Sequence, residues 1–229
     1  MTDGATEPGV VPPEAQQLFG ENTESAARFV DLLAERGVER GVIGPREIDR
    51  LWDRHVLNSA VLAELIPAEA IVVDVGSGGG FPGVPLALAR PDIEATLLEP
   101  MARRVQWLTE VVDELGLTNV VVVRGRAEEK TIRTQLGEAD IVTARAVAPL
   151  ARLAEWCLPL VRASGLLLAL KGASAAEEVQ RDASTVRKVG GESIDVVQCG
   201  VDVVETPTTV VVIEAGPKPK RTRSRRRRR

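Results

Sequence analysis

Cysteine is nearly absent from the 229-residue chain, and this excludes two kinds of protein architecture. Cys157 and Cys199 lie far apart and form no C-x-x-C pair, and His55 is the single histidine. Disulfide frameworks and zinc sites both need several closely spaced cysteines or histidines. We therefore expect a reduced protein with neither disulfides nor a metal site.

Long apolar segments are also missing. No stretch of about 18 apolar residues, the usual minimum for a membrane-spanning helix, occurs in the chain. Residues 1–10 lack the basic start and the apolar run of an export signal. We expect a cytoplasmic protein that does not enter a membrane.

Tyrosine is absent, and aromatic residues make up only 3% of the chain, although 44% of its residues are hydrophobic. The interior must therefore consist mainly of valine, leucine, isoleucine and alanine, a composition typical of α/β domains with buried parallel strands. The length predicts one large domain with extensions rather than two full domains.

Charge is unevenly distributed along the chain. Nine of the 29 lysines and arginines, and no acidic residue, lie in residues 218–229. The other 20 basic residues stand against 33 acidic ones, so residues 1–217 carry a net charge of −13. A basic tail can bind nucleic-acid phosphates with a strong salt dependence. A disordered, solubilising end explains it equally well, and both readings stay open.

Two helical patterns precede the main domain, the first ending at Gly37 and the second starting near Pro45. They are predicted to pack together as an N-terminal helical cap. We expect a disordered start, this cap, a main domain and a disordered basic tail, over residues 1–12, 13–66, 67–215 and 216–229.

Short apolar runs alternate with helical segments through the main domain, as in a parallel sheet that is buried on both faces. Strands are predicted at 70–75, 94–98, 119–123, 139–144, 165–170, 193–199 and 208–214. Helices are predicted at 83–90, 101–115, 127–136, 147–162 and 174–189. The seven strands form a doubly wound, Rossmann-like α/β sheet, in which the direction of the last two strands stays open.

A glycine-rich loop follows the first of these strands, in the sequence V-V-D-V-G-S-G-G-G-F-P-G of residues 72–83. Gly76 and Gly78 remove side chains that would keep a ligand away from the backbone. A phosphate-binding loop would need G-x-x-x-x-G-K-[ST], which is absent. The dinucleotide pattern G-x-G-x-x-G fails from Gly76 because its sixth position is Phe81, and from Gly78 it places Pro82 inside the turn.

Charged residues near the strand ends further restrict the class of ligand that the loop can bind. Asp74, two residues before the first glycine, would repel a pyrophosphate, whereas S-adenosylmethionine offers an ammonium and a sulfonium cation. Glu99 ends the second strand, where ribose hydroxyls are held in such sheets. Glu128 follows the third strand and Arg145 ends the fourth. Taken alone, Glu128 could be a helix N-terminal acid and Arg145 a surface ion-pair partner.

Basic residues outside this edge suggest contacts to a nucleic acid. Arg50, Arg54 and His55 share much of one helical face, and we expect them to face RNA rather than the core. Arg103 opens the helix after Glu99. Lys171 ends the fifth strand, and its ammonium group is predicted to project into the same crevice as the glycine loop.

Four linked motifs go beyond a general fold. They are L-W-D-R-H-V-L-N-S at 51–59, D-V-G-S-G-G-G-F-P-G-V-P-L-A at 74–87, T-A-R-A at 143–146 and L-K-G at 170–172. Together they resemble the RsmG (GidB) family. The resemblance implies a class I methyltransferase that transfers a methyl group from S-adenosylmethionine to N7 of a guanine in 16S ribosomal RNA.

The resemblance also implies site residues. The family's cofactor contacts map onto Gly76, Phe81, Ala127, Glu128 and Arg145, and His55 and Lys171 match further motif positions near the pocket. The chain departs from the family pattern at Asn58, Thr208 and residues 41–44.

The expected chemistry agrees with what the sequence lacks. Guanine N7 carries a lone pair and no proton, so its methylation needs no general base, and Arg145 and Lys171 are the pocket candidates. The [DNS]-P-P-[YF] element of amine methylation is absent, and Cys157 and Cys199 lie in apolar segments unsuited to a nucleophile. The predicted partner is 16S ribosomal RNA or the small ribosomal subunit, bound by a monomer. A methyltransferase acting on a small molecule or a protein, or a non-catalytic RNA-binding module, are the alternatives.

Overall fold

The computed structural model describes residues 9–217 of the chain. Residues 1–8 and 218–229 lie outside this range, so the predicted disordered start and basic tail fall largely beyond it. No helix among the described residues is both long enough and apolar enough to span a membrane.

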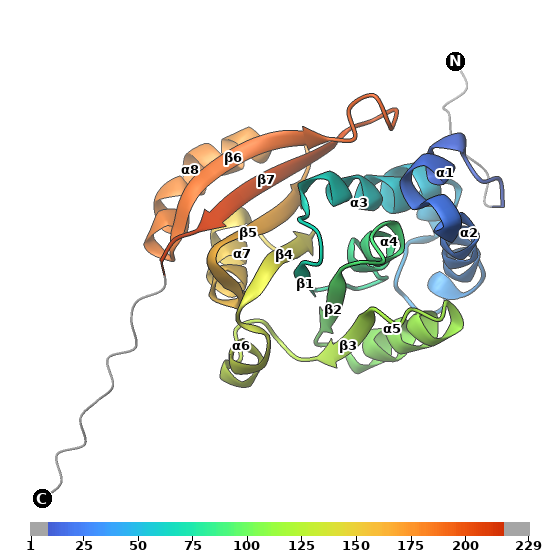
Figure 1. Ribbon diagram of the computed structural model, residues 1–229, viewed down its shortest axis with the longest axis horizontal. Helices are drawn as coiled ribbons and strands as arrows, with labels where there is room; N and C mark the ends of the chain where they lie inside the picture. Colours follow the sequence, from blue (N-terminus) through green and yellow to red (C-terminus); the bar gives the residue numbers. More distant parts are fainter. Residues whose placement is uncertain (1–8, 218–229) are drawn as a thin grey trace, which may run out of the picture.

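A seven-stranded sheet forms the centre of the molecule, as the alternation of apolar runs predicted (Figure 1). Its order is β3-β2-β1-β4-β5-β7-β6, and β7 pairs antiparallel with both β5 and β6 while the other pairs are parallel. The strands are β1 Ile71–Val75, β2 Glu94–Glu99, β3 Val120–Arg124, β4 Ala139–Arg145, β5 Val161–Lys171, β6 Gly191–Cys199 and β7 Thr208–Ala215.

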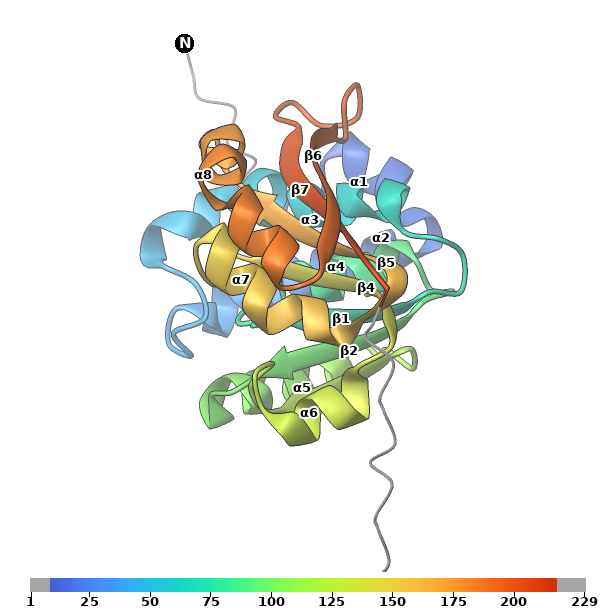
Figure 2. The same cartoon turned by 90° about the vertical axis from the view of Figure 1, so that its left-hand side faces the viewer.

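Alternate strand residues supply two hydrophobic layers. Val72 and Ile141 pack on one face with α4, and Val73 and Val142 pack on the other with α7. Figures 1 and 2 show α7 and α8 on the side of the sheet opposite α1, α2 and α5. The helices of the main domain are α4 Gly83–Ala89, α5 Ala102–Glu114, α6 Lys130–Leu136, α7 Leu150–Cys157 and α8 Ala175–Lys188.

The N-terminal segment packs into the same core as α4 and α5. Phe29 and Trp52 from this segment share one cluster of buried residues with Val84 and Trp107. The predicted continuous helix up to Gly37 is interrupted, because Gly20 adopts a φ of +52°. The segment consists of α1 Pro13–Phe19, η1 Gly20–Asn22, α2 Thr23–Leu32, η2 Leu33–Gly37, η3 Pro45–Arg50, η4 Leu51–Leu57, α3 Asn58–Ala60 and η5 Val61–Leu65.

Two predicted helices of the main domain differ from the structure. The helix expected over 127–136 begins only at Lys130. The helix expected over 147–162 runs only from Leu150 to Cys157, and Val161 already belongs to β5. Pro149 is extended at the N-cap of α7, and a 3-10 turn containing Pro159 follows it. Proline removes an amide donor from a helix and restricts the residue before it, which explains both ends.

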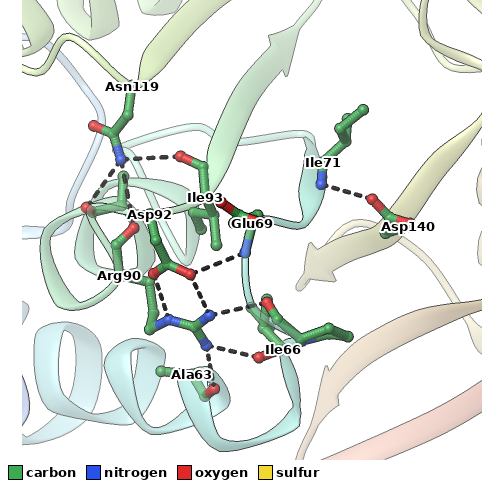
Figure 3. A network of polar contacts seen from close by, with 11 residues as sticks. Ala63, Ile66, Glu69, Ile71, Arg90, Asp92, Ile93, Asn119 and Asp140 are labelled. Carbon is green, nitrogen blue, oxygen red and sulfur yellow. Dashed lines mark hydrogen bonds and ion pairs between the residues drawn. The ribbon is translucent and has the colours of Figure 1, made fainter.

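A polar network joins the N-terminal segment to the start of the sheet (Figure 3). The guanidinium group of Arg90 donates hydrogen bonds to the carbonyl oxygens of Ala63 and Ile66 at 3.1 and 2.6 Å, and to that of Pro67 at 2.9 Å. Asp92 holds the same guanidinium group in an ion pair of 2.7 Å. Since β1 begins at Ile71, this network lies at the edge opposite the glycine loop, and it leaves the carboxyl ends of the strands free.

Candidate functional site

A cavity of about 570 Å³ opens at the carboxyl ends of β1 to β4. The strand order reverses between β1 and β4, which is where open α/β sheets bind their ligands. We call it the strand-end cavity. The predicted site residues on its wall are Gly76, Gly78, Phe81, Glu99, Ala127, Glu128 and Arg145.

Backbone conformation explains the glycines of the loop, residues 76–83. Gly76 has a φ of +74°, and a Cβ atom there would lie 2.9 Å from Cγ2 of Val147. At Gly83, the first residue of α4, a Cβ atom would lie only 2.2 Å from Cδ2 of Leu97. Position 76 therefore requires glycine, because its backbone has a positive φ and the chain after β4 passes close to it. Position 83 requires glycine because α4 packs closely on β2 there.

Asp74 was expected to lie beside the cations of the cofactor, but it lies beneath the glycine loop and not on the cavity wall. Its side chain is 1% exposed and accepts hydrogen bonds from Thr143 Oγ1 at 3.0 Å and from the Gly83 amide at 3.2 Å. Burial raises the pKa of Asp74 to about 6, against the effect of these hydrogen bonds. Because residues alternate along β1, Asp74 faces α4 with Val72. The structure therefore gives it the role of joining β1, β4 and α4.

Glu99 lies in the wall and fixes the backbone around it. One carboxylate oxygen accepts from the Gly78 amide at 3.1 Å, and the other accepts from the Met101 amide at 2.9 Å. Each carboxylate oxygen can accept a second hydrogen bond. The Glu99 side chain is 2% exposed, and Arg104 Nη1 lies 4.0 Å from the oxygen that accepts from Gly78. Glu99 thus holds the glycine loop in place and keeps some acceptor capacity for a ligand's hydroxyl groups.

Ala127 and Glu128 approach the cavity from the loop after β3. Ala127 is buried, and its carbonyl oxygen accepts from Arg133 Nε at 3.1 Å. Glu128 is exposed and lies 4.0 Å from Arg126. Since α6 begins at Lys130, Glu128 stands outside the helix, and its alternative interpretation as a helix N-terminal acid is wrong.

Arg145 is half-buried at the lip of the cavity. Its guanidinium group lies over the Phe81 ring, 5.0 Å from the ring centroid, and contacts Nδ1 of His55. Within residues 9–217, no carboxylate lies at ion-pair distance from it, so the alternative of a surface ion pair is wrong. Burial lowers the pKa of Arg145 to about 10, while the charge of Asp74 acts in the opposite direction. The guanidinium group remains charged at neutral pH.

His55 is buried, and the expectation that it faces RNA is wrong. Its ring is tilted against Phe81 with the centroids 5.1 Å apart, and Nε2 lies 2.6 Å from a carboxylate oxygen of Glu47. Burial, and next the charge of Arg145, lower the pKa of His55 to about 4. The imidazole is therefore neutral at physiological pH.

Lys171 does not reach the strand-end cavity, contrary to the sequence prediction. Its ammonium group forms an ion pair of 2.8 Å with Glu178 on α8 and donates to the Ala148 carbonyl oxygen at 3.0 Å. Alternation along β5 places Lys171 on the face of Leu167 and Ala169, which α7 and α8 cover. The side chain therefore lies on the other face of the sheet from Arg145.

The three remaining RNA candidates are exposed. Arg50 and Arg54 border a second hollow of about 600 Å³, between the start of α1 and the turn after β6. Arg103 lies at the start of α5, beside Gly41. Two departures from the family pattern meet near this hollow, since Thr208 Oγ1 donates to the Asn58 carbonyl oxygen at 2.9 Å.

Several wall residues were not predicted from the sequence. Val42, Met101 and Trp156 line the strand-end cavity, and the indole of Trp107 donates to the Gly79 carbonyl oxygen at 3.1 Å. Met101 could have been inferred, because it follows Glu99 at the end of β2. Val42 could not, because only the tertiary packing of the N-terminal segment brings residues 41–44 to the glycine loop.

Neither cysteine is placed for nucleophilic chemistry. Cys157 and Cys199 are fully buried, and neither lines the strand-end cavity. Burial raises the pKa of both thiols, that of Cys199 to about 12. In the described part of the chain, no group of three or more histidine, cysteine or acidic residues is arranged to hold a metal ion.

Comparison with known proteins identifies relatives over most of the chain. The model of the GidB family, described as rRNA small subunit methyltransferase G, matches residues 22–205. A Rhodococcus jostii protein named Ribosomal RNA small subunit methyltransferase G is 54% identical over 204 residues, which cover 89% of each chain. The Corynebacterium efficiens protein of the same name is 51% identical over 209 residues, or 91% of this chain and 90% of its own.

Solved structures of lower identity share the fold. The S-adenosylmethionine-dependent methyltransferase SibL aligns with a TM-score of 0.58 and 17% identity, over 90% of this chain and 73% of its own. A SAM-dependent methyltransferase from Aquifex aeolicus aligns with a TM-score of 0.52 and 21% identity, over 76% of this chain and 99% of its own. These likenesses confirm the predicted class I methyltransferase fold.

Proposed function

This chain belongs to the GidB family, and from that premise we propose that it methylates N7 of a guanine in 16S ribosomal RNA, with S-adenosylmethionine as the methyl donor. The relatives named above act, by their names, on small-subunit ribosomal RNA. The observation that carries the proposal is the strand-end cavity, which joins the glycine loop, Glu99 and the Arg145–Phe81 pair. A cytoplasmic monomer that acts on the small ribosomal subunit or its RNA fits this activity.

The cavity fits S-adenosylmethionine in size and in chemistry. Its volume of about 570 Å³ lies within the range of small-molecule sites. Gly76 and Gly78 leave the backbone open to a ligand, and Glu99 offers acceptors for ribose hydroxyl groups. Met101 and Phe81 supply apolar surface beside these polar groups. Arg145 supplies a positive charge without a carboxylate partner among the described residues, which suits the ligand's own carboxylate.

The proposed reaction is a direct methyl transfer. The N7 lone pair forms a bond to the methyl carbon while the carbon–sulfur bond breaks with its electrons going to sulfur, so the products are 7-methylguanosine and S-adenosylhomocysteine. N7 carries no proton, so no side chain has to accept one. The absence of histidine, cysteine and lysine from the described cavity wall is compatible with this chemistry.

The protein's part in the reaction is positioning. Glu99 holds Gly78 and Met101, Asp74 holds the start of α4, and Phe81 supports the guanidinium group of Arg145. Correct alignment of reacting groups contributes roughly 7 to 11 kcal/mol to a reaction barrier in favourable cases. Arg50, Arg54 and Arg103 are the exposed cations that we propose as RNA phosphate contacts.

A direct assay tests the function. Purified protein is incubated with S-adenosylmethionine carrying a tritiated methyl group and with small-subunit RNA from a strain that lacks the modification. The expected product is 7-methylguanine in the 16S RNA digest. Label on another base atom would contradict the assigned chemistry, and transfer to protein or small molecules without RNA would contradict the assigned substrate. Assembled 30S particles assayed in parallel determine which form of the RNA is used.

A further inference from the structure

His55 connects a carboxylate outside the strand-end cavity to the cation on its wall. Nε2 of the imidazole lies 2.6 Å from Glu47 Oε2, and Nδ1 contacts Nη2 of Arg145. The His55 side chain is 11% exposed and does not itself line the cavity. The three side chains come from η3, η4 and the end of β4, so the contact joins the N-terminal segment to the sheet.

The chemistry of the three groups fixes the tautomer of His55. Arg145 can only donate hydrogen bonds, so Nδ1 must present its lone pair to the guanidinium group. An ionised carboxylate can only accept, so Nε2 must carry the proton that it donates to Glu47. Both requirements are met by one neutral tautomer. A protonated imidazole would turn an N–H group toward Arg145 and repel it.

His55 also supports Arg145 through its backbone. The His55 carbonyl oxygen lies 3.5 Å from Nη1 of Arg145 and accepts a hydrogen bond of 2.6 Å from Ser59 Oγ, while Ser59 Oγ lies 3.4 Å from the same Nη1. Phe81 packs against both side chains. These contacts occupy one edge of the guanidinium group, and its other N–H donors remain for a ligand in the cavity.

We propose that His55, held by Glu47 in its Nε2-protonated neutral form, is a positioning residue that orients Arg145 toward the bound cofactor. Glu47 acts one step further away, by setting which nitrogen of His55 accepts. This proposal rests on the proposed function, because it takes the ligand of the strand-end cavity to be S-adenosylmethionine. Burial and the charge of Arg145, which lower the pKa of His55 to about 4, support the neutral form.

The test compares variants that keep or remove each contact. His55→Leu keeps side-chain bulk and removes both ring nitrogens, whereas His55→Asn keeps an acceptor near the position of Nδ1. Glu47→Gln keeps an acceptor for the Nε2 proton and removes only the charge.

The affinity of each variant for S-adenosylmethionine is measured by calorimetry. Without His55, ligand binding must itself order Arg145, and a hydrogen bond to a charged group is equivalent to about tenfold or more in an equilibrium constant. His55→Leu should therefore weaken binding by up to about tenfold. His55→Asn and Glu47→Gln should each lose less than about threefold, since the principal hydrogen bond survives.

A double-mutant cycle separates positioning from a merely structural role. In an Arg145→Ala background, His55→Leu should cause no further loss of affinity, because the group that it orients is gone. In steady-state methyl transfer, His55→Leu should raise KM for S-adenosylmethionine with kcat nearly unchanged.

Leu57→Ala removes a buried side chain from the same helical segment and serves as the control for destabilisation. It should lower the melting temperature and leave cofactor affinity unchanged.

The possible results lead to different conclusions. Equal losses from His55→Leu with and without Arg145, or no loss in either background, would overturn the proposal while leaving the proposed function intact. If the unmodified protein does not bind S-adenosylmethionine, the proposed function itself fails. Circular dichroism at the assay temperature confirms that every variant compared is folded.

Discussion

A side chain at Gly76 would be unfavourable for two separate reasons, a positive φ and the nearness of Val147. We predict that Gly76→Asp abolishes binding of S-adenosylmethionine in calorimetry, because the carboxylate adds bulk and charge to the cavity wall. Gly76→Ala should retain weak binding, because its main cost is the left-handed backbone conformation, which is roughly 1 to 2 kcal/mol for a non-glycine residue.

Gly116 provides the matched control for this substitution. It has a φ of +62°, yet a Cβ atom there would meet no atom of residues 9–217 within 4 Å, and it lies away from the strand-end cavity. Gly116→Ala therefore reproduces the conformational cost without the clash. It should lower stability but leave cofactor affinity unchanged. Unaltered affinity in Gly76→Asp would show that the loop does not contact the ligand.

Asp74 should make stability depend on pH with an unusual sign. Burial raises the pKa of its carboxyl group from 3.8 to about 6, so between these values the folded state binds the proton more tightly than the unfolded state. The contribution of Asp74 to the free energy of unfolding therefore rises as the pH falls from 6 toward 3.8. Asp74→Asn can donate to Thr143 and accept from Gly83, and it should remove this dependence.

Urea unfolding of both proteins at several pH values between 4 and 7.5 measures the effect. The unmodified protein should gain roughly 1 to 3 kcal/mol relative to Asp74→Asn over this range as the pH is lowered. His55 titrates in the opposite sense in both proteins, so its contribution cancels in the difference. A constant difference across the range would show that Asp74 has no raised pKa.

Residues were predicted well from the sequence where the topology of a strand end determined their place. Gly76, Glu99 and Arg145 follow directly from strands that meet at the switch point, and all three lie on the cavity wall. Lys171 was predicted wrongly because the face of a strand end depends on alternation along that strand. His55 was predicted wrongly because the spacing of residues along a helix shows which of them share a face, but not which face packs against the main domain.

The elements of the sheet were easier to predict than those of the N-terminal segment. Most strands are rich in β-branched residues, whereas β2 and β5 contain short apolar runs of leucine and alanine. All have a length that fits a buried sheet, so their positions depend on local sequence. Residues 45–65 form mainly 3-10 and π turns, with α-helix only at Asn58–Ala60. Apolar residues that recur every three to four positions fit a 3-10, an α or a π helix, so the sequence pattern does not distinguish these three helix types. Their backbone follows the packing of Trp52 and Leu62 instead.

At the scale of elements, Arg90 connects η5 to the turn between α4 and β2 (Figure 3). We predict that Arg90→Ala lowers the free energy of unfolding by roughly 2 to 4 kcal/mol, because three carbonyl oxygens and one carboxylate lose their donor. Cofactor affinity should persist, since the network lies at the opposite edge of the sheet. Chemical denaturation and calorimetry measure the two effects.

Arg28→Ala is the control for Arg90→Ala. Arg28 makes two ion pairs, with Glu35 and Glu114, where Arg90 makes one, but the Arg28 side chain is 40% exposed and that of Arg90 21%. Exposed pairs contribute little to stability. The loss should therefore be much smaller than for Arg90→Ala. Equal losses would mean that the carbonyl contacts of Arg90 do not stabilise the fold.

At the scale of the whole molecule, the division of charge between body and tail leads to a prediction about RNA binding. Deleting residues 218–229 should weaken RNA affinity and flatten its salt dependence, by about 0.7 to 0.9 in the log–log slope for each phosphate that the tail neutralises. A variant of full length, with the nine lysines and arginines replaced by glutamine, separates charge from length. An unchanged slope in both variants would assign the tail to solubility.

The hydrogen bond from Trp107 to the Gly79 carbonyl oxygen has a practical consequence. The chain has no tyrosine and three tryptophans, so its near-ultraviolet emission comes from Trp52, Trp107 and Trp156. Trp156 lines the strand-end cavity and Trp107 holds the backbone of the glycine loop, whereas Trp52 is buried in the N-terminal core. Intrinsic fluorescence therefore reports on two sides of the cavity. Ligand titrations can be followed without a dye, and replacing Trp107 or Trp156 by phenylalanine assigns the signal to one side.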